Sequence, residues 1–508
     1  MNVDLSRIPS PQIDYTVNQF FVVHVPAAIG SCSDFFGTLI QGYTWATSNG
    51  EIGDTMWAFK MEKNDVIYFV SFIVLGVSFS QAFAEPPPPQ FIQFSPSATM
   101  GALYMPDPEK FPEPHIATLA MHRDSNFMSH ISTQEMPKRG IVALGMNPRC
   151  QNNEALCTPW ENNALDVKQG VEYLRSLPGI TTVILIGHSG GGPTMAFYQA
   201  IAENGNSLCK DPERLTKCPD TIKDLPPADG VIFWDAHLGN GINALRSLNP
   251  AVINDEEILN KNALPELDPR LDPFSPDNDY SRDGNSNYSD EFKESYFEAQ
   301  SKRMNKLIDI ALDRMKQIEA GTYKYPDDDS FIVPRADISR LMRLDRSIDH
   351  STVKPHKEIK NDGTIEDCCV VESVRPIDID PEGNEQFWEG TRFLSLRSFL
   401  SVRAIRSRHA MNDIDYCSSN NSTLCNVQHI SVPVLVTAMT GHYFVRNSEL
   451  IYDFTASEDK DFVAIEGATH GGRPCTACMP EGQEYDGRYD NVVKNDFDYL
   501  ANWINTRF

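Results

Sequence analysis

Short apolar runs alternate with an amphipathic stretch in the first part of the chain. The runs at residues 101–105, 115–122 and 140–145 are apolar and have the length of a strand, whereas residues 165–177 place apolar side chains on one helical face. Strands and helices carry different apolar periods, so this pattern predicts three strands followed by a helix.

A β-branched apolar run at residues 181–186 comes next and leads into Gly187-His188-Ser189-Gly190-Gly191. Apolar positions at helical spacing continue directly after it, which indicates a strand, a sharp turn and a helix. Residues 230–235 are predicted to form a further strand. Strands that alternate with helices predict the α/β class, with a mostly parallel central sheet and helices on both of its faces.

The alternation stops after the strand predicted at residues 230–235. Residues 241–430 contain an acidic, turn-rich stretch, a predicted long helix at 289–317 and a predicted basic helix at 391–408. We therefore predict a large insertion, mainly helical and irregular, that forms a cap over the core.

The alternation resumes in the last part of the chain. Strands are predicted at residues 432–438 and 461–466, and helices at 448–455 and 493–504. Residues 91–240 and 431–508 are therefore predicted to be two parts of one core domain.

A segment upstream of the core has the features of a secretory signal peptide. Residues 61–84 begin with a short polar stretch, continue with an apolar run and end in Ala-Phe-Ala. On this hypothesis translation begins at Met61, and residues 1–60 lie outside the natural protein. The alternative is a signal-anchor helix, with residues 1–60 on the cytoplasmic side.

Composition and cysteine usage agree with export. The 508 residues carry a formal charge of −26, which argues against nucleic acid or an anionic membrane as a partner. Of eleven cysteines, only Cys32 precedes the expected cleavage site. Close pairs in the rest predict local disulfides (150/157, 209/218, 417/425 and 475/478). Asn287, Asn420 and Asn421 begin glycosylation motifs.

The turn around Ser189 carries the clearest chemical signal. In a G-x-S-x-G turn between a strand and a helix, small flanking residues let the two elements approach and leave the serine exposed. This stretch resembles the nucleophile elbow of the α/β-hydrolase superfamily. The resemblance implies that Ser189 is a nucleophile, and that its base is a histidine after the last strand, where His470 stands.

The carboxylate that orients the histidine has two candidates. Most of the superfamily carries it in the loop after the strand at 432–438, where the nearest carboxylate is Glu449, in the first turn of the next helix. Some members carry it after the preceding strand, where Asp235 stands. We favour Asp235 and keep Glu449 as the alternative.

The resemblance also implies an oxyanion hole built from backbone amides. Gly190 is expected to supply one N–H group, and Arg123 or Asp124, in the loop after residues 115–122, the second. Acyl transfer to a serine needs neither a metal nor an organic cofactor, so none is expected.

These observations predict a secreted serine hydrolase that acts on a small-molecule ester, lactone or amide. An acyltransferase with the same three residues is one alternative, and a non-catalytic hydrolase-like binding protein is another. No nucleic-acid partner is expected, and no membrane partner after signal cleavage. The sequence sets neither the substrate nor the oligomeric state.

Overall fold

The computed structural model describes residues 87–508, apart from residues 98, 151–152, 256–264, 283, 338, 377–389 and 481. The predicted upstream segment and signal peptide lie outside the described residues, as does Cys32. In the described part of the chain, no helix combines the length and the apolar character that crossing a membrane requires.

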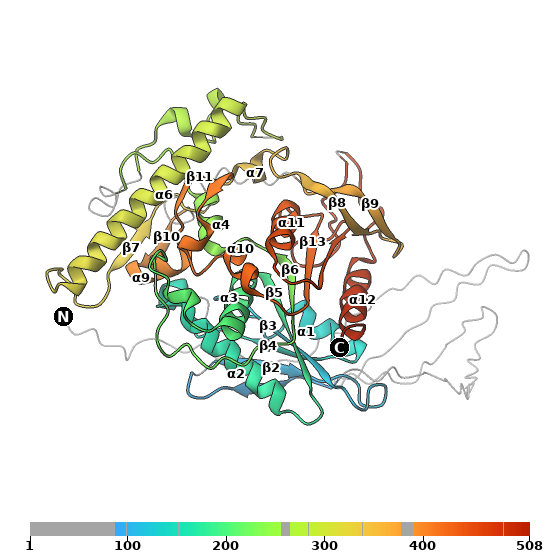
Figure 1. Ribbon diagram of the computed structural model, residues 1–508. Coiled ribbons are helices and arrows are strands. Elements are labelled where there is room, and N and C mark those ends of the chain that lie inside the picture. The colour runs from blue at the N-terminus through green and yellow to red at the C-terminus, as the bar shows by residue number, and fades with distance from the viewer. Residues whose placement is uncertain are drawn as a thin grey trace, which may run out of the picture. The chain divides into compact units, whose positions relative to one another are not determined.

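The central sheet has ten strands within the described residues (Figure 1), in the order β1-β2-β4-β3-β5-β6-β13-β14-β8-β9. Neighbours from β4 to β8 in this order are parallel, whereas β1, β2 and β9 pair antiparallel. The strands are β1 (Gln90–Gln93), β2 (Met100–Tyr104), β3 (Ile116–Met121), β4 (Val142–Met146), β5 (Thr182–Ser189), β6 (Gly230–Ala236), β8 (Ser351–Ile359), β9 (Ile365–Glu372), β13 (Val434–Met439) and β14 (Lys460–Ile465).

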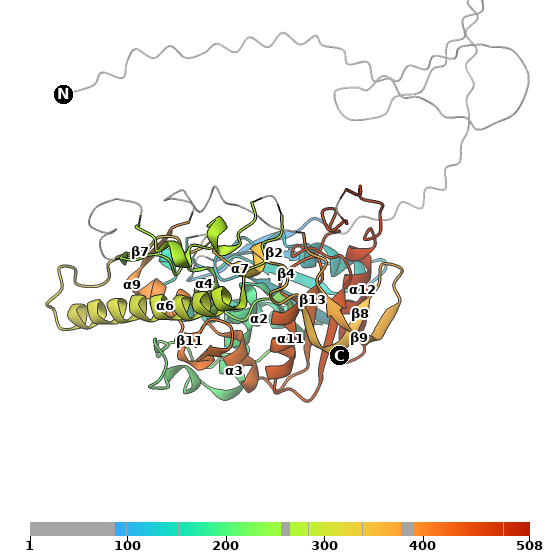
Figure 2. The same cartoon turned by 90° about the horizontal axis from the view of Figure 1, so that it is seen from above.

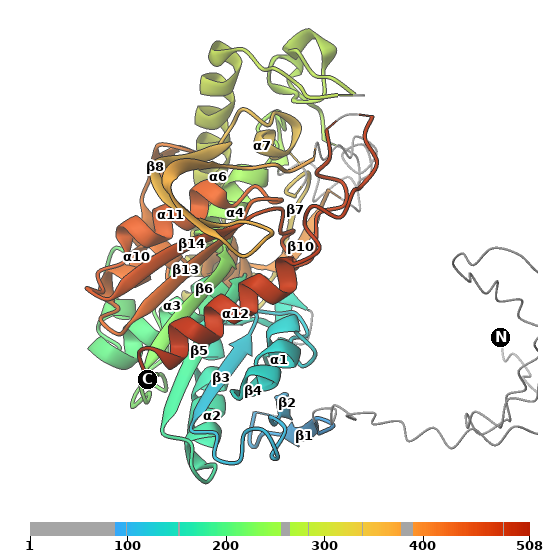
Figure 3. The same ribbon diagram turned by 90° about the vertical axis from the view of Figure 1, so that its right-hand side faces the viewer.

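Helices cover both faces of this sheet, as the alternating pattern predicted. Successive side chains of a strand point to opposite faces, so Val183 and Leu185 of β5 join one apolar cluster and Ile184 and Ile186 the other. Figure 3 shows α1 and α12 on one face. The helices of the core are α1 (Ile131–Glu135), α2 (Asn163–Ser176), α3 (Gly191–Asn204), α11 (Val445–Phe454) and α12 (Val492–Asn505).

Most of the region between β6 and β13 packs outside the sheet. Its longest element, α6, begins after Ser289, whose side chain accepts a hydrogen bond from the Phe292 N–H group, and lies alongside α4 (Figure 2). The region contains α4 (Asn240–Ser247), α6 (Asp290–Glu319), β7 (Ser330–Val333), α7 (Leu341–Leu344), β10 (Arg392–Ser395), α9 (Leu396–Ser398), β11 (Ser407–His409), β12 (Asp413–Ile414) and α10 (Thr423–Asn426).

Two parts of this region differ from the sequence predictions. Strands β8 and β9 lie within 241–430 but extend the central sheet beyond β14. The predicted basic helix at 391–408 is instead the strand β10, which pairs with β7, followed by short helical turns and the strand β11. All four residues of β10 pair antiparallel with β7, which makes this segment a strand.

Cysteine side chains in the described residues lie in five pairs. Four are the predicted local pairs 150/157, 209/218, 417/425 and 475/478. The fifth joins the adjacent residues Cys368 and Cys369 in β9.

Candidate active site

Ser189 is the last residue of β5, and its backbone has a φ of 54°. A serine rarely adopts this left-handed conformation, which turns the chain sharply from the strand into α3. Gly191 and Gly192 follow it, and neighbouring atoms lie too close to either glycine to leave room for a side chain. A Cβ on Gly191 would lie 2.7 Å from the carbonyl oxygen of Met121, and one on Gly192 would lie 2.6 Å from the Cβ of Ala236.

Asp235 lies beside this turn because β5 and β6 are neighbouring parallel strands, with Ser189 opposite Ala236. Its side chain is fully buried. His470, in the loop after β14, places Nδ1 2.5 Å from Asp235 Oδ2, and the Met439 N–H group donates to Oδ1 at 3.2 Å. A carboxylate in this position fixes the His470 tautomer, with the proton on Nδ1 and Nε2 able to accept another.

A second histidine approaches the same carboxylate. His442 Nδ1 lies 2.8 Å from Asp235 Oδ2, and its ring stacks on that of His470 with centroids 4.2 Å apart. Burial alone would raise the pKa of Asp235, but His442 and His470 outweigh it and lower the pKa to about 2. Burial lowers the pKa of His442 to about 4. Asp235 is therefore an anion and His442 is neutral near pH 7.

Among the described residues, these three side chains could also hold a metal ion, since one ligand atom of each lies within 4.8 Å of the others. The distance of 2.5 Å between His470 Nδ1 and Asp235 Oδ2 is that of a hydrogen bond with a proton between the atoms. Two ligands about 2.1 Å from one tetrahedral ion would lie farther apart. The geometry therefore fits an oriented base better than a metal site.

A chain of neutral histidines supports the His470 backbone. His188, the variable residue of the turn, has Nε2 2.8 Å from the carbonyl oxygen of His470 and Nδ1 2.9 Å from His130 Nε2. His130 Nδ1 in turn lies 2.7 Å from the Ser132 hydroxyl. Burial lowers the pKa of both His130 and His188, so the two rings are uncharged and each can donate one hydrogen bond and accept another.

The backbone amides predicted to form the oxyanion hole differ in their hydrogen bonds. The Gly190 N–H group donates to His122 Nε2 at 3.1 Å, while His122 Nδ1 lies 2.8 Å from Asp124 Oδ1. The Asp124 N–H group is 3.4 Å from His122 Nδ1. Within the described residues, neither the Arg123 amide nor the Ser189 hydroxyl forms a hydrogen bond.

Glu449 lies in a different environment from His470. It is fully buried in α11, where the N–H groups of Val353 and Lys354 donate to it at 2.8 Å and His356 Nε2 lies 3.1 Å away. Burial would raise its pKa, but these contacts lower it to about 2. Glu449 thus connects α11 to β8, and Asp235 is the one of the two carboxylates that contacts His470.

Four histidines near the site are not predicted from the sequence, namely His122, His130, His237 and His442. His442 follows β13, in the loop where most of the superfamily carries the acid, and this position is a signal visible in the sequence. His122 precedes the two amides predicted for the oxyanion hole, and no pattern in the sequence predicts a role for its side chain. His237 comes two residues after Asp235, and its N–H group donates to the Ser189 carbonyl at 3.4 Å.

The strand order, the helices on both faces and the serine at the strand-to-helix turn define an α/β-hydrolase fold. No family model matches the chain, and no curated protein matches it. Among solved structures, it is similar to Est1E from Butyrivibrio proteoclasticus, with 12% identity over 82% of this chain and 100% of the other and a TM-score of 0.34. It is also similar to a soluble variant of monoglyceride lipase from Saccharomyces cerevisiae, with 11% identity, 84% and 98% coverage and a TM-score of 0.35.

Proposed function

We propose that this chain is a serine hydrolase that cleaves a carboxylic ester, a lactone or an amide through an acyl-serine intermediate. The observation that carries the proposal is the contact of 2.5 Å between His470 and Asp235, beside the turn where Ser189 ends its strand. A base oriented by a buried carboxylate, beside a partly exposed serine, is the arrangement that activates a hydroxyl for attack.

In the proposed mechanism, Ser189 Oγ attacks the carbonyl carbon while its proton passes to His470 Nε2. Asp235 accepts the Nδ1 hydrogen bond throughout and stabilises the imidazolium ion that forms. His470 then returns the proton to the leaving oxygen or nitrogen, which leaves an acyl-serine ester. Water, deprotonated by the same histidine, attacks that ester and releases the acid and the free serine.

The experiment combines labelling by a fluorophosphonate probe with hydrolysis of p-nitrophenyl esters of increasing acyl length. Wild-type protein should be labelled and active, and Ser189→Ala should lose both properties. Asp235→Asn should lower kcat by about 10⁴-fold, because an amide does not support the required tautomer. Glu449→Gln is the matched control, since it alters a buried carboxylate that has other partners, and it should keep its activity.

Two outcomes would contradict parts of the proposal. Activity lost in Glu449→Gln but kept in Asp235→Asn would assign the acid to Glu449. Folded wild-type protein that neither reacts with the probe nor turns over any ester would favour a non-catalytic binding protein. Two observations favour that alternative. The Gly190 N–H group, which an oxyanion would need, donates to His122, and the Ser189 hydroxyl forms no hydrogen bond within the described residues.

We also propose that the protein is exported. Five cysteine pairs in the described residues support this location, because disulfides persist in oxidising compartments.

A further inference from the structure

The sequence contains three Asn-x-Ser/Thr motifs, and their asparagines have different surroundings in the structure. The motifs begin at Asn287, Asn420 and Asn421. An oligosaccharide on an asparagine side chain is bulky and hydrated, so the folded chain can carry it only where the side chain reaches the surface. The exposure and the hydrogen bonds of each asparagine therefore decide which motif can be used.

Asn287 lies on the surface, in the segment that leads into α6. The residue is exposed, and within the described residues its side chain forms no hydrogen bond. Exposed and buried positions alternate along residues 285–289. Successive side chains of an extended chain point to opposite sides, so Asn287 and Ser289 both face outward. The amide and the hydroxyl of this motif are thus accessible on the same side.

The buried neighbours of Asn287 hold this segment in place. Ser286 is buried, and its N–H group donates to the Leu344 carbonyl oxygen at 3.0 Å. Tyr288 is buried as well, and its hydroxyl donates to the Pro273 carbonyl oxygen at 2.7 Å. These contacts lie on the inner side of the segment. A glycan on Asn287 would therefore displace none of them.

Asn420 is buried, and both hydrogens of its amide group are in use. The residue is 1% exposed, and Nδ2 donates to Glu161 Oε1 at 2.8 Å and to the Thr216 carbonyl oxygen at 3.1 Å. A side-chain amide nitrogen carries two hydrogens. A sugar attached to Nδ2 would replace one of them and break one of these two bonds in the interior.

Asn421 is fully enclosed. Its Oδ1 accepts hydrogen bonds from the N–H group and the side-chain amide of Asn240 at 2.9 and 2.8 Å, and its Nδ2 is buried. A Cβ on Gly239 would lie 2.5 Å from the Asn421 carbonyl oxygen, and residues 418–427 are all buried. Protein interiors contain few voids larger than a water molecule, so a sugar ring has no room at Nδ2.

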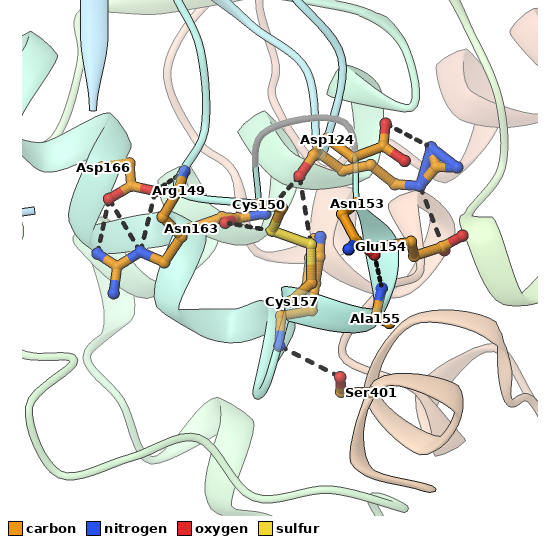
Figure 4. The surroundings of a disulfide bond; sticks show 12 residues. Asp124, Arg149, Cys150, Asn153, Glu154, Ala155, Cys157, Asn163, Asp166 and Ser401 are labelled. Atoms are coloured by element: carbon orange, nitrogen blue, oxygen red, sulfur yellow. Dashed lines mark hydrogen bonds and ion pairs between the residues drawn. A yellow bond between two sulfur atoms is a disulfide. The ribbon is translucent and has the colours of Figure 1, made fainter. Parts of the chain in front are cut away.

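Asn153 shows the opposite combination, exposure without the motif. It lies in the loop closed by Cys150 and Cys157, and its Oδ1 accepts a hydrogen bond from the Ala155 N–H group at 3.2 Å (Figure 4). Ala155 stands where the motif requires serine or threonine. Asn153 is therefore a matched control position for Asn287.

We propose that Asn287 carries an N-linked glycan and that Asn420 and Asn421 stay unmodified. The donor is an oligosaccharide linked to a polyprenyl pyrophosphate. A bond forms between Asn287 Nδ2 and C1 of the first sugar, and the bond from C1 to the pyrophosphate oxygen breaks. The pyrophosphate leaves with the bonding electrons, Nδ2 loses one proton, and nothing is oxidised or reduced. The proposal rests on the proposed export and is independent of the hydrolase chemistry.

The test expresses the full chain in a eukaryotic host and analyses the protein recovered from the medium. Peptide-N-glycosidase removes N-linked glycans and leaves an aspartate at each former site, so peptide mass analysis locates every glycan. We expect one modified position, Asn287, and unmodified peptides for Asn420 and Asn421. Removal of the glycan should also change the gel mobility in a single step.

Four variants sharpen the test. Asn287→Gln should lose the glycan and still be secreted, because the side chain has no partner to lose. Ser289→Ala should lose the glycan too, whereas Ser289→Thr should keep it. The threonine retains the hydroxyl of the motif and the acceptor that Ser289 provides for the Phe292 N–H group at the start of α6. Ala155→Ser gives the exposed Asn153 the missing hydroxyl and should add a second glycan.

The outcomes separate this proposal from the others. Secreted protein without a glycan on Asn287 would overturn it and leave the export standing. A glycan on Asn420 or Asn421 of folded protein would also overturn it, because burial would then not select the site. Protein that stays in the cytosol with neither disulfides nor a glycan would overturn the export as well. The hydrolase function is tested separately, by the fluorophosphonate probe.

Discussion

Asp496 in α12 is a carboxylic acid buried behind the proposed catalytic residues. It is fully buried, and Trp234 Nε1 donates to its Oδ2 at 2.8 Å. Its other oxygen, Oδ1, is buried without a hydrogen-bond partner. Burial raises the pKa of Asp496 from 3.8 to about 7, more than the Trp234 hydrogen bond and Arg139 lower it. We expect its ionisation to make the free energy of unfolding depend on pH.

The sign follows from the direction of the shift. A carboxyl whose pKa is higher in the folded state than in the unfolded state stabilises the fold fully only below its unfolded pKa, and this contribution is lost as pH rises through the folded value. The pKa is 3.8 in the unfolded state and about 7 in the folded state. Relative to its value at low pH, the free energy of unfolding is therefore lower by about 2 kcal/mol at pH 5 and by about 4 kcal/mol at pH 9. Asp496→Asn removes this dependence, because an amide does not titrate.

The assay is urea unfolding of wild type and Asp496→Asn at several pH values from 5 to 9. The variant carries a cost of about 1–3 kcal/mol that does not vary with pH, because the amide buries one more unpartnered donor than the neutral carboxyl does. Its stability relative to wild type should nevertheless rise by about 2–3 kcal/mol between pH 5 and pH 9. The control is Asp498→Asn, on the same helix but half exposed, in an ion pair with Arg139. A difference between wild type and Asp496→Asn that stays constant with pH would refute the reasoning.

Two further predictions concern stability. Gly192→Ala should lower the free energy of unfolding by about 1–3 kcal/mol, because its Cβ would lie 2.6 Å from that of Ala236. Gly471→Ala, whose Cβ would meet nothing within 4 Å, is the control in the same urea titration, and equal midpoints would contradict the close approach. Replacing both Cys150 and Cys157 by Ser should cost about 2 kcal/mol, by releasing a short loop in the unfolded chain. An unchanged unfolding midpoint under non-reducing conditions would count against that bond.

The core strands and the serine turn could be predicted because their signals are local. A buried parallel strand is a continuous apolar run, and β3, β5 and β6 are buried along almost their whole length. Strand β9, by contrast, is exposed at all positions but one, and β8 is buried at only three. Neither strand has a strong apolar pattern, so their place in the central sheet is not predictable from the sequence.

The candidate site was only partly accessible to sequence reasoning. Ser189 and His470 stand out by the residues around them, whereas the choice between Asp235 and Glu449 depends on which loop meets His470. Which loops meet in space depends on the order of all the strands in the sheet. Patterns in a single sequence do not determine that order.

The placement of β9 at the end of the sheet also affects how molecules of this protein meet. Within the described residues, β9 pairs on one side only, with β8, so its other side presents free backbone groups. Such an edge can accept a strand from another molecule. Glu366, Asp367 and Glu372 are exposed along it. A second copy docking there would bring carboxylates close to carboxylates, so the acidic edge opposes self-association by strand addition.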